Sequence, residues 1–216
     1  MKRLALTIFL TGLLAVVLTG CDEKEMKDSR NENVPKESRN ENVLKDARDG
    51  KTYKTVKIGE QVWMAENLNY KTENSYCYKD NEANCAKYGR LYEWDAAKTA
   101  CPAGWHLPSM VEFYALIGAV GGEDVAGKKL KSTSGWDEYE GKSGNGDDAF
   151  GFSALPAGHR YYNGDYNDEG LNANFWSSTE NSSDFAYDMY LNFLSDKAYL
   201  DFNTKDFGFS VRCLKD

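Results

Sequence analysis

The sequence has few of the residues on which catalytic and metal sites are most often built. It contains only two histidines, His106 and His159, and their spacing matches no zinc-ligand pattern. It has no Cys-x-x-Cys pair, and no Gly-x-Ser-x-Gly elbow surrounds the adjacent Ser177 and Ser178. We therefore find no catalytic constellation in the sequence and expect a protein that is not an enzyme.

Positive charge and long apolar runs are also scarce. The 26 basic residues are outnumbered by 34 acidic ones, which gives a net charge of −8. Nucleic-acid binders usually present a basic face, so no nucleic-acid partner is expected. The main apolar run, residues 4–18, is about 15 residues long and too short for a comfortable transmembrane helix.

This apolar run has the features of a secretion signal. Two basic residues precede it, and it ends in Leu18-Thr19-Gly20-Cys21. A small residue before a cysteine at this place resembles the lipobox of bacterial lipoproteins. The resemblance implies that residues 1–20 are removed and that Cys21 carries acyl chains such as palmitate, which anchor the protein to a membrane. The alternative is an ordinary signal peptide with a chance cysteine.

The residues after Cys21 bear on the final location. Asp22 resembles the signal that keeps some lipoproteins on the inner membrane, whereas the acidic run 22–25 resembles a surface-export signal. We expect a lipid-anchored protein of the bacterial cell envelope, with its domain in the periplasm or on the cell surface. The choice between the inner and the outer membrane stays open.

Residues 21–45 have the composition of a disordered tether behind the lipidated cysteine. Of residues 22–45, 13 are charged, so the segment cannot bury enough apolar surface to offset its ordering entropy. Residues 29–34 recur as residues 38–43. Two copies in so polar a stretch are too few for a solenoid and indicate a duplicated spacer.

Residues 46–216 form the expected folded domain. Residues 52–58 and 62–64 read as two strands with a turn between them. Helical spacing covers residues 89–100, and a second helix begins with a capping box of Ser109 and Glu112 and stops at Gly121-Gly122.

The second half of the domain is rich in loops and strands. Residues 135–148 and 158–172 are crowded with Gly, Asn, Asp and Tyr, and a short strand is expected between them at 150–155. Alternating apolar residues predict strands over 185–193 and 207–213. The order predicts an α+β fold: one domain with an antiparallel sheet, two main helices and a long loop region.

Four cysteines besides Cys21 suit an oxidising compartment. Three pairings are open. Cys77 and Cys85 flank a short polar excursion, which favours a local disulfide and leaves Cys101 to pair with Cys213. A zinc site and a redox-active pair are the alternatives, and neither has the expected spacing or a neighbour that would lower a thiol pKa.

Six motifs resemble one bacterial family, the Fibrobacter succinogenes major paralogous domain. The motifs occur in order at residues 49–53, 63–68, 101–109, 151–158, 175–180 and 208–213. Members are typically secreted or lipid-anchored and have no established activity. The resemblance also implies a distant similarity to the C-type-lectin-like and formylglycine-generating-enzyme fold group, and hence a C-type-lectin-like domain.

The functional residues of that fold group do not transfer to this sequence. A calcium-dependent lectin site resembles Glu-Pro-Asn and Trp-Asn-Asp, and neither motif occurs; Trp176 is followed by two serines. The formylglycine-generating enzymes need a particular pair of cysteines, and Cys213 has no second cysteine near it in sequence. The resemblance therefore implies a fold and not an activity.

Two acidic turns are candidates for binding calcium, the one cofactor we consider. Oxygen ligands gather around glycine-rich turns in both, although neither has the EF-hand spacing. The candidate ligands are Asn145, Asp147, Asp148, Asp165 and Asp168. The alternative is that these turns are ordinary solvated surface.

The segment 158–172 also offers candidate ligand-binding residues. Tyr161, Tyr162, Tyr166 and His159 lie among Gly, Asn and Asp. Aromatic faces stack on sugar rings, and the amides and carboxylates bind hydroxyls. The alternative is that the tyrosines pack the loop onto the core.

These features predict a non-enzymatic, lipid-anchored binding module whose ligand is carbohydrate or another cell-envelope polymer. Two other classes stay open: a structural or protein-interaction domain that binds a surface protein, and an enzyme of the formylglycine-generating-enzyme-like fold with an unrecognised site. A reactive free thiol would favour that enzyme, and two closed disulfides would weaken it.

Overall fold

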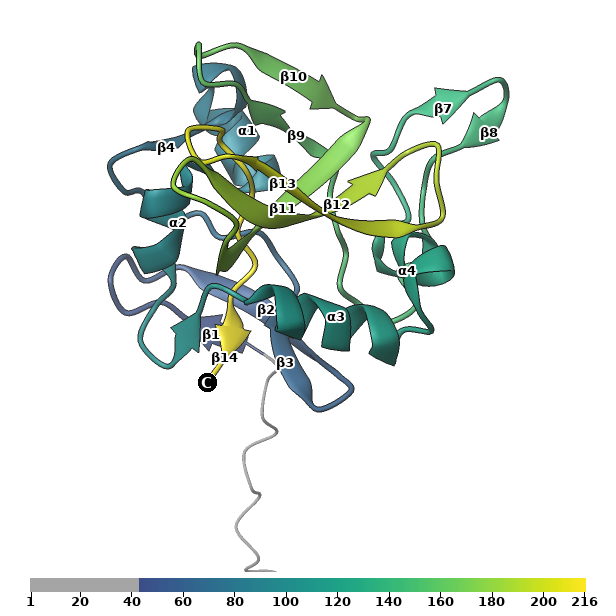
Figure 1. Ribbon diagram of the computed structural model, residues 1–216, viewed down its shortest axis with the longest axis horizontal. Coiled ribbons are helices and arrows are strands. Elements are labelled where there is room, and N and C mark those ends of the chain that lie inside the picture. Colours follow the sequence, from purple (N-terminus) through teal and green to yellow (C-terminus); the bar gives the residue numbers. More distant parts are fainter. Residues whose placement is uncertain (1–42) are drawn as a thin grey trace, which may run out of the picture. The chain divides into compact units, whose positions relative to one another are not determined.

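A computed structural model describes residues 43–216; the expected signal peptide, the lipidated Cys21 and most of the tether lie outside this range. The described part has the α+β composition that the sequence predicts (Figure 1). Its helices are η1 (Tyr78–Asp80), α1 (Glu82–Tyr88), α2 (Trp94–Ala100), α3 (Met110–Ala119) and α4 (Glu123–Leu130). Its strands are β1 (Val43–Lys45), β2 (Thr52–Ile58), β3 (Gln61–Met64), β4 (Ser75–Tyr76), β5 (Leu91–Tyr92), β6 (Trp105–His106), β7 (Glu138–Tyr139), β8 (Lys142–Ser143), β9 (Ala157–Arg160), β10 (Tyr166–Glu169), β11 (Asn172–Glu180), β12 (Phe185–Asn192), β13 (Ala198–Thr204) and β14 (Leu214–Lys215).

The first sheet joins the two ends of the described chain. Its strand order is β1-β2-β3-β14-β6, and all neighbours are antiparallel. Strands β2 and β3 form the hairpin that the sequence predicts. Leu214 of β14 pairs with Trp63 of β3, so the last strand closes the sheet against this first hairpin (Figure 1).

The predicted boundary between tether and domain at residue 46 is too late. Val43–Lys45 form β1, which pairs with β2, and Leu44 is buried beside Tyr53. This strand has three residues and a single buried side chain, so it leaves no periodic signal in a charged stretch. Only its pairing with β2 makes it part of the domain.

The second sheet has two chemically different faces. Its order is β10-β9-β11-β12-β13, with antiparallel neighbours except for β9 and β11, which are parallel. Side chains alternate across a strand. One face, with Phe175, Met189 and Leu191, packs in a core cluster with residues of α3 and α4. The register places polar residues on the opposite face: Asn172, Asn174, Asp188, Tyr190, Asp201 and Asn203.

Helix α3 begins and ends as the sequence predicts. The Ser109 hydroxyl accepts a hydrogen bond from the backbone N–H of Glu112 at 3.3 Å, and the Glu112 carboxylate accepts one from the N–H of Ser109 at 2.7 Å. Gly121 and Gly122 have φ of 110° and 94°. Because side-chain-bearing residues rarely adopt these angles, the two glycines end the helix.

The predicted helix over residues 89–100 is correct only in its second half. Leu91 and Tyr92 form β5, which pairs with β4, and Tyr92 also pairs with Phe209. The helix, α2, starts at Trp94. Pairing with β4 and the bridge to Phe209 thus override local helical spacing, because tertiary context often outweighs helix propensity.

Helices α1 and α4 were not expected. Gly127 lies inside α4, where glycine lowers helix propensity. The structure requires glycine there, because a Cβ at this position would lie 2.2 Å from the carbonyl oxygen of Lys197. The close approach docks α4 under the loop between β12 and β13.

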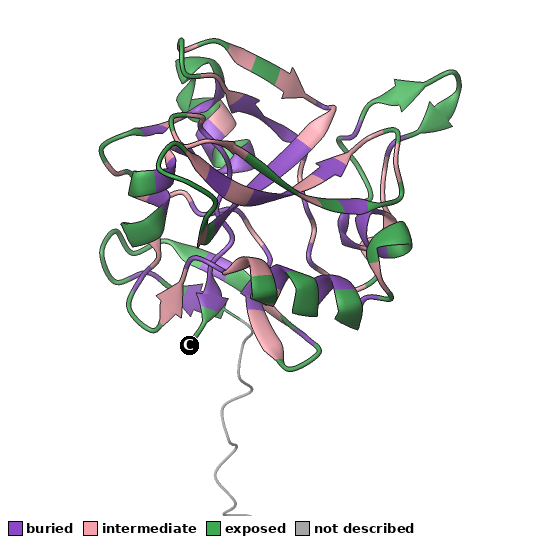
Figure 2. Cartoon of the chain, viewed as in Figure 1, coloured by how far each residue is buried: buried purple, intermediate pink, exposed green. Residues whose placement is uncertain are grey.

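Parts of the segments expected to be loops are hairpins. Strands β7 and β8 pair with each other within residues 135–148, and β9 pairs with β10 within residues 158–172. Both strands of the β7–β8 hairpin are exposed (Figure 2). Strands without a buried face lack the alternation of apolar residues that reveals a strand in sequence.

Two predicted strands are replaced by single bridges. In residues 150–155 only Ala154 forms a bridge, to Lys131. In residues 207–213 three isolated bridges join Gly208 to Arg160, Phe209 to Tyr92 and Ser210 to Phe175. Each of these segments is buried between two elements rather than in a sheet, which produces the same apolar pattern as a strand.

Both disulfides join the pairs that the sequence favours. Cys77 is bonded to Cys85, and Cys101 is bonded to Cys213. The second bond links the end of α2 to the C-terminal segment. Both bonds are closed, so the four cysteines of the described range hold no free thiol.

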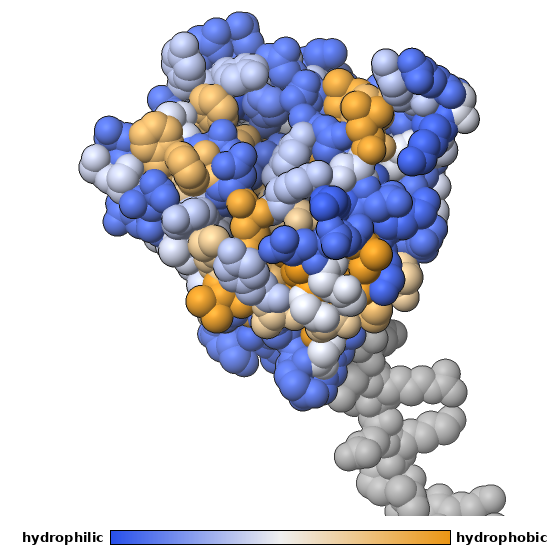
Figure 3. Space-filling view, turned by 45° about the vertical axis from the view of Figure 1, so that its right-hand side comes forward, coloured by the Kyte–Doolittle hydropathy of each residue, from blue (hydrophilic) through white to orange (hydrophobic). Residues whose placement is uncertain are grey.

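No helix within residues 43–216 is long and apolar enough to span a membrane. On the face drawn in Figure 3, apolar side chains form small separate patches among hydrophilic ones. Exposed large apolar residues such as Val111, Tyr162 and Phe202 come from different elements. These residues therefore do not form one broad apolar patch, and a cavity is the better candidate for a functional site.

Candidate functional site

A cavity of about 190 Å³ lies on the polar face of the second sheet. It is lined by residues of β9, β11, β12 and β13 and of the segment before β14. These are His159, Tyr161, Asn172, Asn174, Tyr190, Asp201, Asn203, Phe207 and Phe209. The cavity is smaller than the roughly 300 Å³ at which drug-sized sites begin, so its size suits a single ring or end group.

Aromatic rings form one wall of this cavity. The ring of His159 lies parallel to that of Phe207, with centroids 6.1 Å apart, and Tyr161 meets both rings edge-on at 4.6 and 5.0 Å. Tyr162 stacks on Phe207 at 6.2 Å and is 68% exposed. The wall therefore continues to the surface through Tyr162.

A buried carboxylate lies behind the cavity's amides. Asp188 is 0% exposed, and its two oxygens accept hydrogen bonds from Nδ2 of Asn174 at 3.0 Å and of Asn203 at 2.8 Å. Burial raises the pKa of Asp188 to about 6, because desolvation outweighs the two amide hydrogen bonds. These bonds also fix which end of each amide faces Asp188.

Two polar atoms of the cavity's residues are buried without a partner: Oδ1 of Asn174 and Nε2 of His159. The two residues are 7% and 8% exposed. A buried polar atom without a partner costs about 1–3 kcal/mol, and native proteins retain few of them. Both atoms belong to residues that line the cavity.

Hydrogen bonds hold the third side of the cavity in place. The Tyr190 hydroxyl donates to Oδ1 of Asn172 at 3.3 Å and accepts from Nδ2 of Asn192 at 2.7 Å. Nδ2 of Asn192 also donates to Asn172 Oδ1, at 2.8 Å. This network fixes the rotamers of the residues that a ligand would contact.

The structure brings only part of the predicted aromatic group together. His159 and Tyr161 line the cavity and Tyr162 lies on its aromatic wall, whereas Tyr166 does not reach it. The Tyr166 hydroxyl donates to Asp80 at 2.6 Å and its ring packs on Tyr78. Its role is to hold β10 against η1, which is the packing alternative given above.

The predicted calcium ligands are occupied by protein donors. Asn145 accepts from the N–H of Trp136, Asp148 accepts from the N–H of Ser153, and Asp147 forms an ion pair with Lys128. Asp165 accepts from Asn163 and Asp168 from Asn172. They come from separate loops. Calcium binding stays a prediction. The described residues do not bring these five candidate ligands together around one point.

Sequence reasoning missed most of the cavity. Asn172, Asn174, Asp201 and Asn203 lie two positions apart in their strands, as do Asp188 and Tyr190. Period-two spacing of amides and carboxylates in otherwise apolar strands is the signal that could have revealed the polar face. In residues 185–193 the apolar alternation predicts the strand but does not mark its polar face.

A larger cavity of about 460 Å³ lies beside the Cys77–Cys85 disulfide. Its charged side chains already have partners: Lys51 donates to Asp49, and Glu66 accepts from the N–H of Lys54. None of its lining residues contains an unpartnered buried polar side-chain atom. We therefore prefer the smaller cavity as the functional site.

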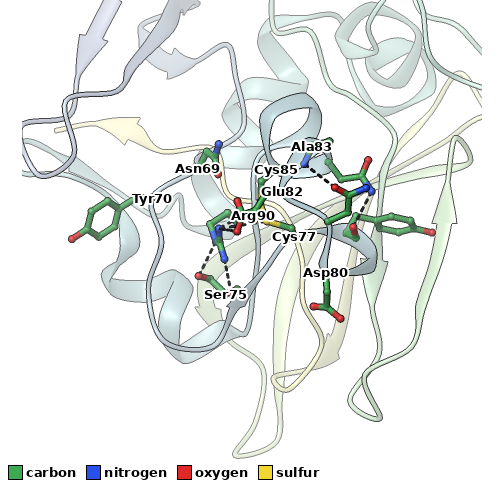
Figure 4. Close-up of a disulfide and its surroundings, with 12 residues drawn as sticks. Asn69, Tyr70, Ser75, Cys77, Asp80, Glu82, Ala83, Cys85 and Arg90 are labelled. Atoms are coloured by element: carbon green, nitrogen blue, oxygen red, sulfur yellow. Dashed lines mark hydrogen bonds and ion pairs between the residues drawn. A yellow bond between two sulfur atoms is a disulfide. The ribbon is translucent and has the colours of Figure 1, made fainter.

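The Cys77–Cys85 disulfide, next to the larger cavity, lies against the side chain of Arg90 (Figure 4). The buried Arg90 guanidinium lies 3.5 and 3.4 Å from the sulfurs of Cys77 and Cys85, and donates to the Ser75 hydroxyl and carbonyl. With Glu82 these sulfurs form the one cluster of three His, Cys, Asp or Glu ligand atoms found within residues 43–216. Because both sulfurs are in the disulfide, the cluster lacks the thiolates that a metal would need.

The lining of the chosen cavity combines aromatic rings, amides and one carboxylate. Burial lowers the pKa of His159, and the nearby Asp168 only partly opposes this. The ring is therefore neutral near pH 7. The arrangement can stack on a ring and exchange hydrogen bonds with its substituents.

The comparisons with known proteins assign a family. The model of the Fibrobacter succinogenes major domain matches residues 56–215. No curated protein is detectably similar to the chain, and neither is any solved structure. The matched range contains the cavity, both disulfides and five of the six motifs in full. The chain therefore belongs to the Fibrobacter succinogenes major domain family.

Proposed function

We propose that this protein is a lipid-anchored, extracytoplasmic binding module whose cavity on the polar face of β11, β12 and β13 binds carbohydrate or a related cell-envelope polymer without catalysing a reaction. The observation that carries the proposal is the pairing of an aromatic wall with the unpartnered buried atoms of Asn174 and His159 in one cavity. A sugar ring has an apolar face that stacks on aromatic rings and hydroxyls that supply the missing hydrogen bonds.

The anchor and the tether complete this proposal. Cys21 would hold the chain on a membrane of the cell envelope, and the charged segment behind it would let the domain reach nearby polymers. As a coil of the 21 residues 22–42 such a tether spans on the order of 25 Å. Incorporation of labelled palmitate that is lost on Cys21→Ala would support the anchor; unchanged labelling would exclude it.

We also infer that the domain is a distant member of the C-type-lectin-like fold group. The α+β composition and the antiparallel sheets support this inference. It concerns fold alone. Superposition of an experimental structure of this chain on members of the group tests it, and a different order of strands would reject it.

Binding to insoluble polysaccharides tests the proposed function. The full chain, purified in mild detergent, is mixed with a panel of cell-wall and plant polysaccharides, with and without a chelator. We expect saturable binding to at least one of them, and a loss of about tenfold or more on Tyr161→Ala, because the variant removes one aromatic wall of the cavity.

Tyr139→Ala is the matched control for Tyr161→Ala. Tyr139 is an exposed tyrosine on β7 that does not line the cavity, so its removal should leave binding unchanged. Equal losses in both variants would place the binding surface elsewhere. No binding to any polysaccharide by the folded chain would reject the carbohydrate ligand and favour a protein partner.

A further inference from the structure

Two carboxylates face each other at the cavity, one buried behind its amides and one in its lining. Asp188 of β12 and Asp201 of β13 are directly opposed in the antiparallel register, so their side chains point to the same face of the sheet. Asp201 lines the cavity. Like charges in this arrangement destabilise a sheet, so the pair is an unfavourable element that the fold retains.

Neither carboxylate has a cationic partner among residues 43–216. Asp188 accepts only from the amides of Asn174 and Asn203, and Asp201 accepts from the N–H of Phe202. None of the nine residues that line the cavity is lysine or arginine. Asp188 is buried, where a charge is costly unless it is paired, and Asp201 is exposed at the cavity. A cationic ligand would supply the opposite charge that the described residues do not.

A ligand that donates hydrogen bonds would satisfy both unpartnered atoms of the cavity's residues. Asn174 uses its Nδ2 on Asp188, which leaves the carbonyl oxygen Oδ1, an acceptor, without a partner. Asp168 lies 3.7 Å from Nδ1 of His159 and favours the proton on that nitrogen, so that the unpartnered Nε2 is also an acceptor.

We propose that the cavity selects a sugar with a protonated amine, the free amino sugar of a polysaccharide, over its acetylated and hydroxyl counterparts. This inference rests on the proposed carbohydrate binding. The ammonium group supplies both the positive charge that Asp188 and Asp201 lack and the donors that Asn174 and His159 lack. The sugar ring lies against the aromatic wall that Tyr161 and Phe207 form.

Isothermal titration calorimetry with three matched oligosaccharides tests the selectivity. The full chain in mild detergent is titrated with β-1,4-linked oligomers of glucosamine, N-acetylglucosamine and glucose, at a pH below the pKa of the sugar amine. We expect the glucosamine oligomer to bind about tenfold tighter or more than the other two, as for one new charge-assisted interaction.

Asp201→Asn should remove this preference, because the variant deletes the exposed carboxylate and keeps the side chain's shape. Asp184→Asn is the control: Asp184 is exposed just before β12 and does not line the cavity. It removes the same charge and should preserve the preference. Equal loss in both variants would attribute selectivity to net charge and overturn the proposal.

The remaining outcomes separate this inference from the function on which it rests. Equal affinity for all three oligomers, or tighter binding of the acetylated one, would overturn the amine selectivity and leave carbohydrate binding intact. Binding that disappears with a chelator would show that a metal ion occupies the acidic end of the cavity, which would also overturn it. Binding of none of the oligomers or polysaccharides would reject both.

Discussion

Arg212 donates its Nε–H to Oδ1 of Asn67 over 2.6 Å and joins two motifs that are 145 positions apart. The same guanidinium donates to the carbonyl oxygens of Met64, Phe152 and Ser153, and so reaches a third motif. Arg212 is 0% exposed. Three of the six motifs therefore meet at one buried side chain that holds the domain together and does not line the candidate site.

Replacement of this arginine should be among the most damaging substitutions in the domain. Arg212→Met leaves Asn67 Oδ1 and three carbonyl oxygens without their donor, and we expect a loss of about 3–5 kcal/mol in the free energy of unfolding. Urea denaturation measures it. Lys57→Met, which removes an exposed ion pair with Glu60, should cost less than about 1 kcal/mol. Similar losses would contradict the central role of Arg212.

The two disulfides should differ in their contribution to stability. Cys101 and Cys213 are separated by 112 positions, and Cys77 and Cys85 by 8. The chain-entropy model gives about 4.8 kcal/mol for the long loop and about 2.6 kcal/mol for the short one. Removal of each pair as a double alanine variant, followed by chemical denaturation, should show this order. The reverse order would mean that local strain or packing, rather than loop length, decides.

Asp188 should make the domain more stable in mild acid. Its pKa is raised from 3.8 to about 6, so the folded state binds a proton more readily than the unfolded state. The resulting stabilisation is present below pH 3.8 and is lost as the pH rises through 6, by up to about 3 kcal/mol.

The difference between wild type and Asp188→Asn isolates this contribution from that of other carboxyl groups. The variant should be the more stable protein near pH 7 and should lose that advantage towards pH 4. Unfolding free energies at a series of pH values measure it. A constant difference across this range would show that Asp188 does not change protonation between the two states.

Gly158 should be intolerant of a side chain. It lies in β9 next to His159 with φ of 63°, and a Cβ there would come within 2.3 Å of the Asn167 carbonyl oxygen. We expect Gly158→Ala to destabilise the domain by more than about 1 kcal/mol and to displace His159 from the cavity. Gly104→Ala, at φ of 79° with open space around it, shares the backbone strain and lacks the clash. Equal effects would contradict the steric explanation.

Tyr166→Phe separates the packing role of the tyrosines from their proposed binding role. The variant loses the hydrogen bond to Asp80 and should cost about 1 kcal/mol of stability without a change in polysaccharide binding. Thermal unfolding and a binding isotherm measure the two effects. Weakened binding with unchanged stability would place Tyr166 in the ligand site after all.

The sequence by itself determined the family, the α+β class and helix α3 with its capping box, and it favoured the pairs of cysteines that the structure shows. These features are encoded in local or chemically unique signals: a motif, a cap, a turn glycine or a cysteine that has few partners. They do not depend on which distant segment packs against them.

Tertiary structure alone decided the site. Tyr161 and His159 were found from composition, but Asn174, Asp188, Asp201 and Asn203 share a face only because β11, β12 and β13 pair in one register. Likewise, Tyr92 is a strand residue because it pairs with Ser75 of β4, and it also forms a bridge to Phe209. Strand register and long-range packing are set by the whole chain's burial of apolar surface, which no local pattern records.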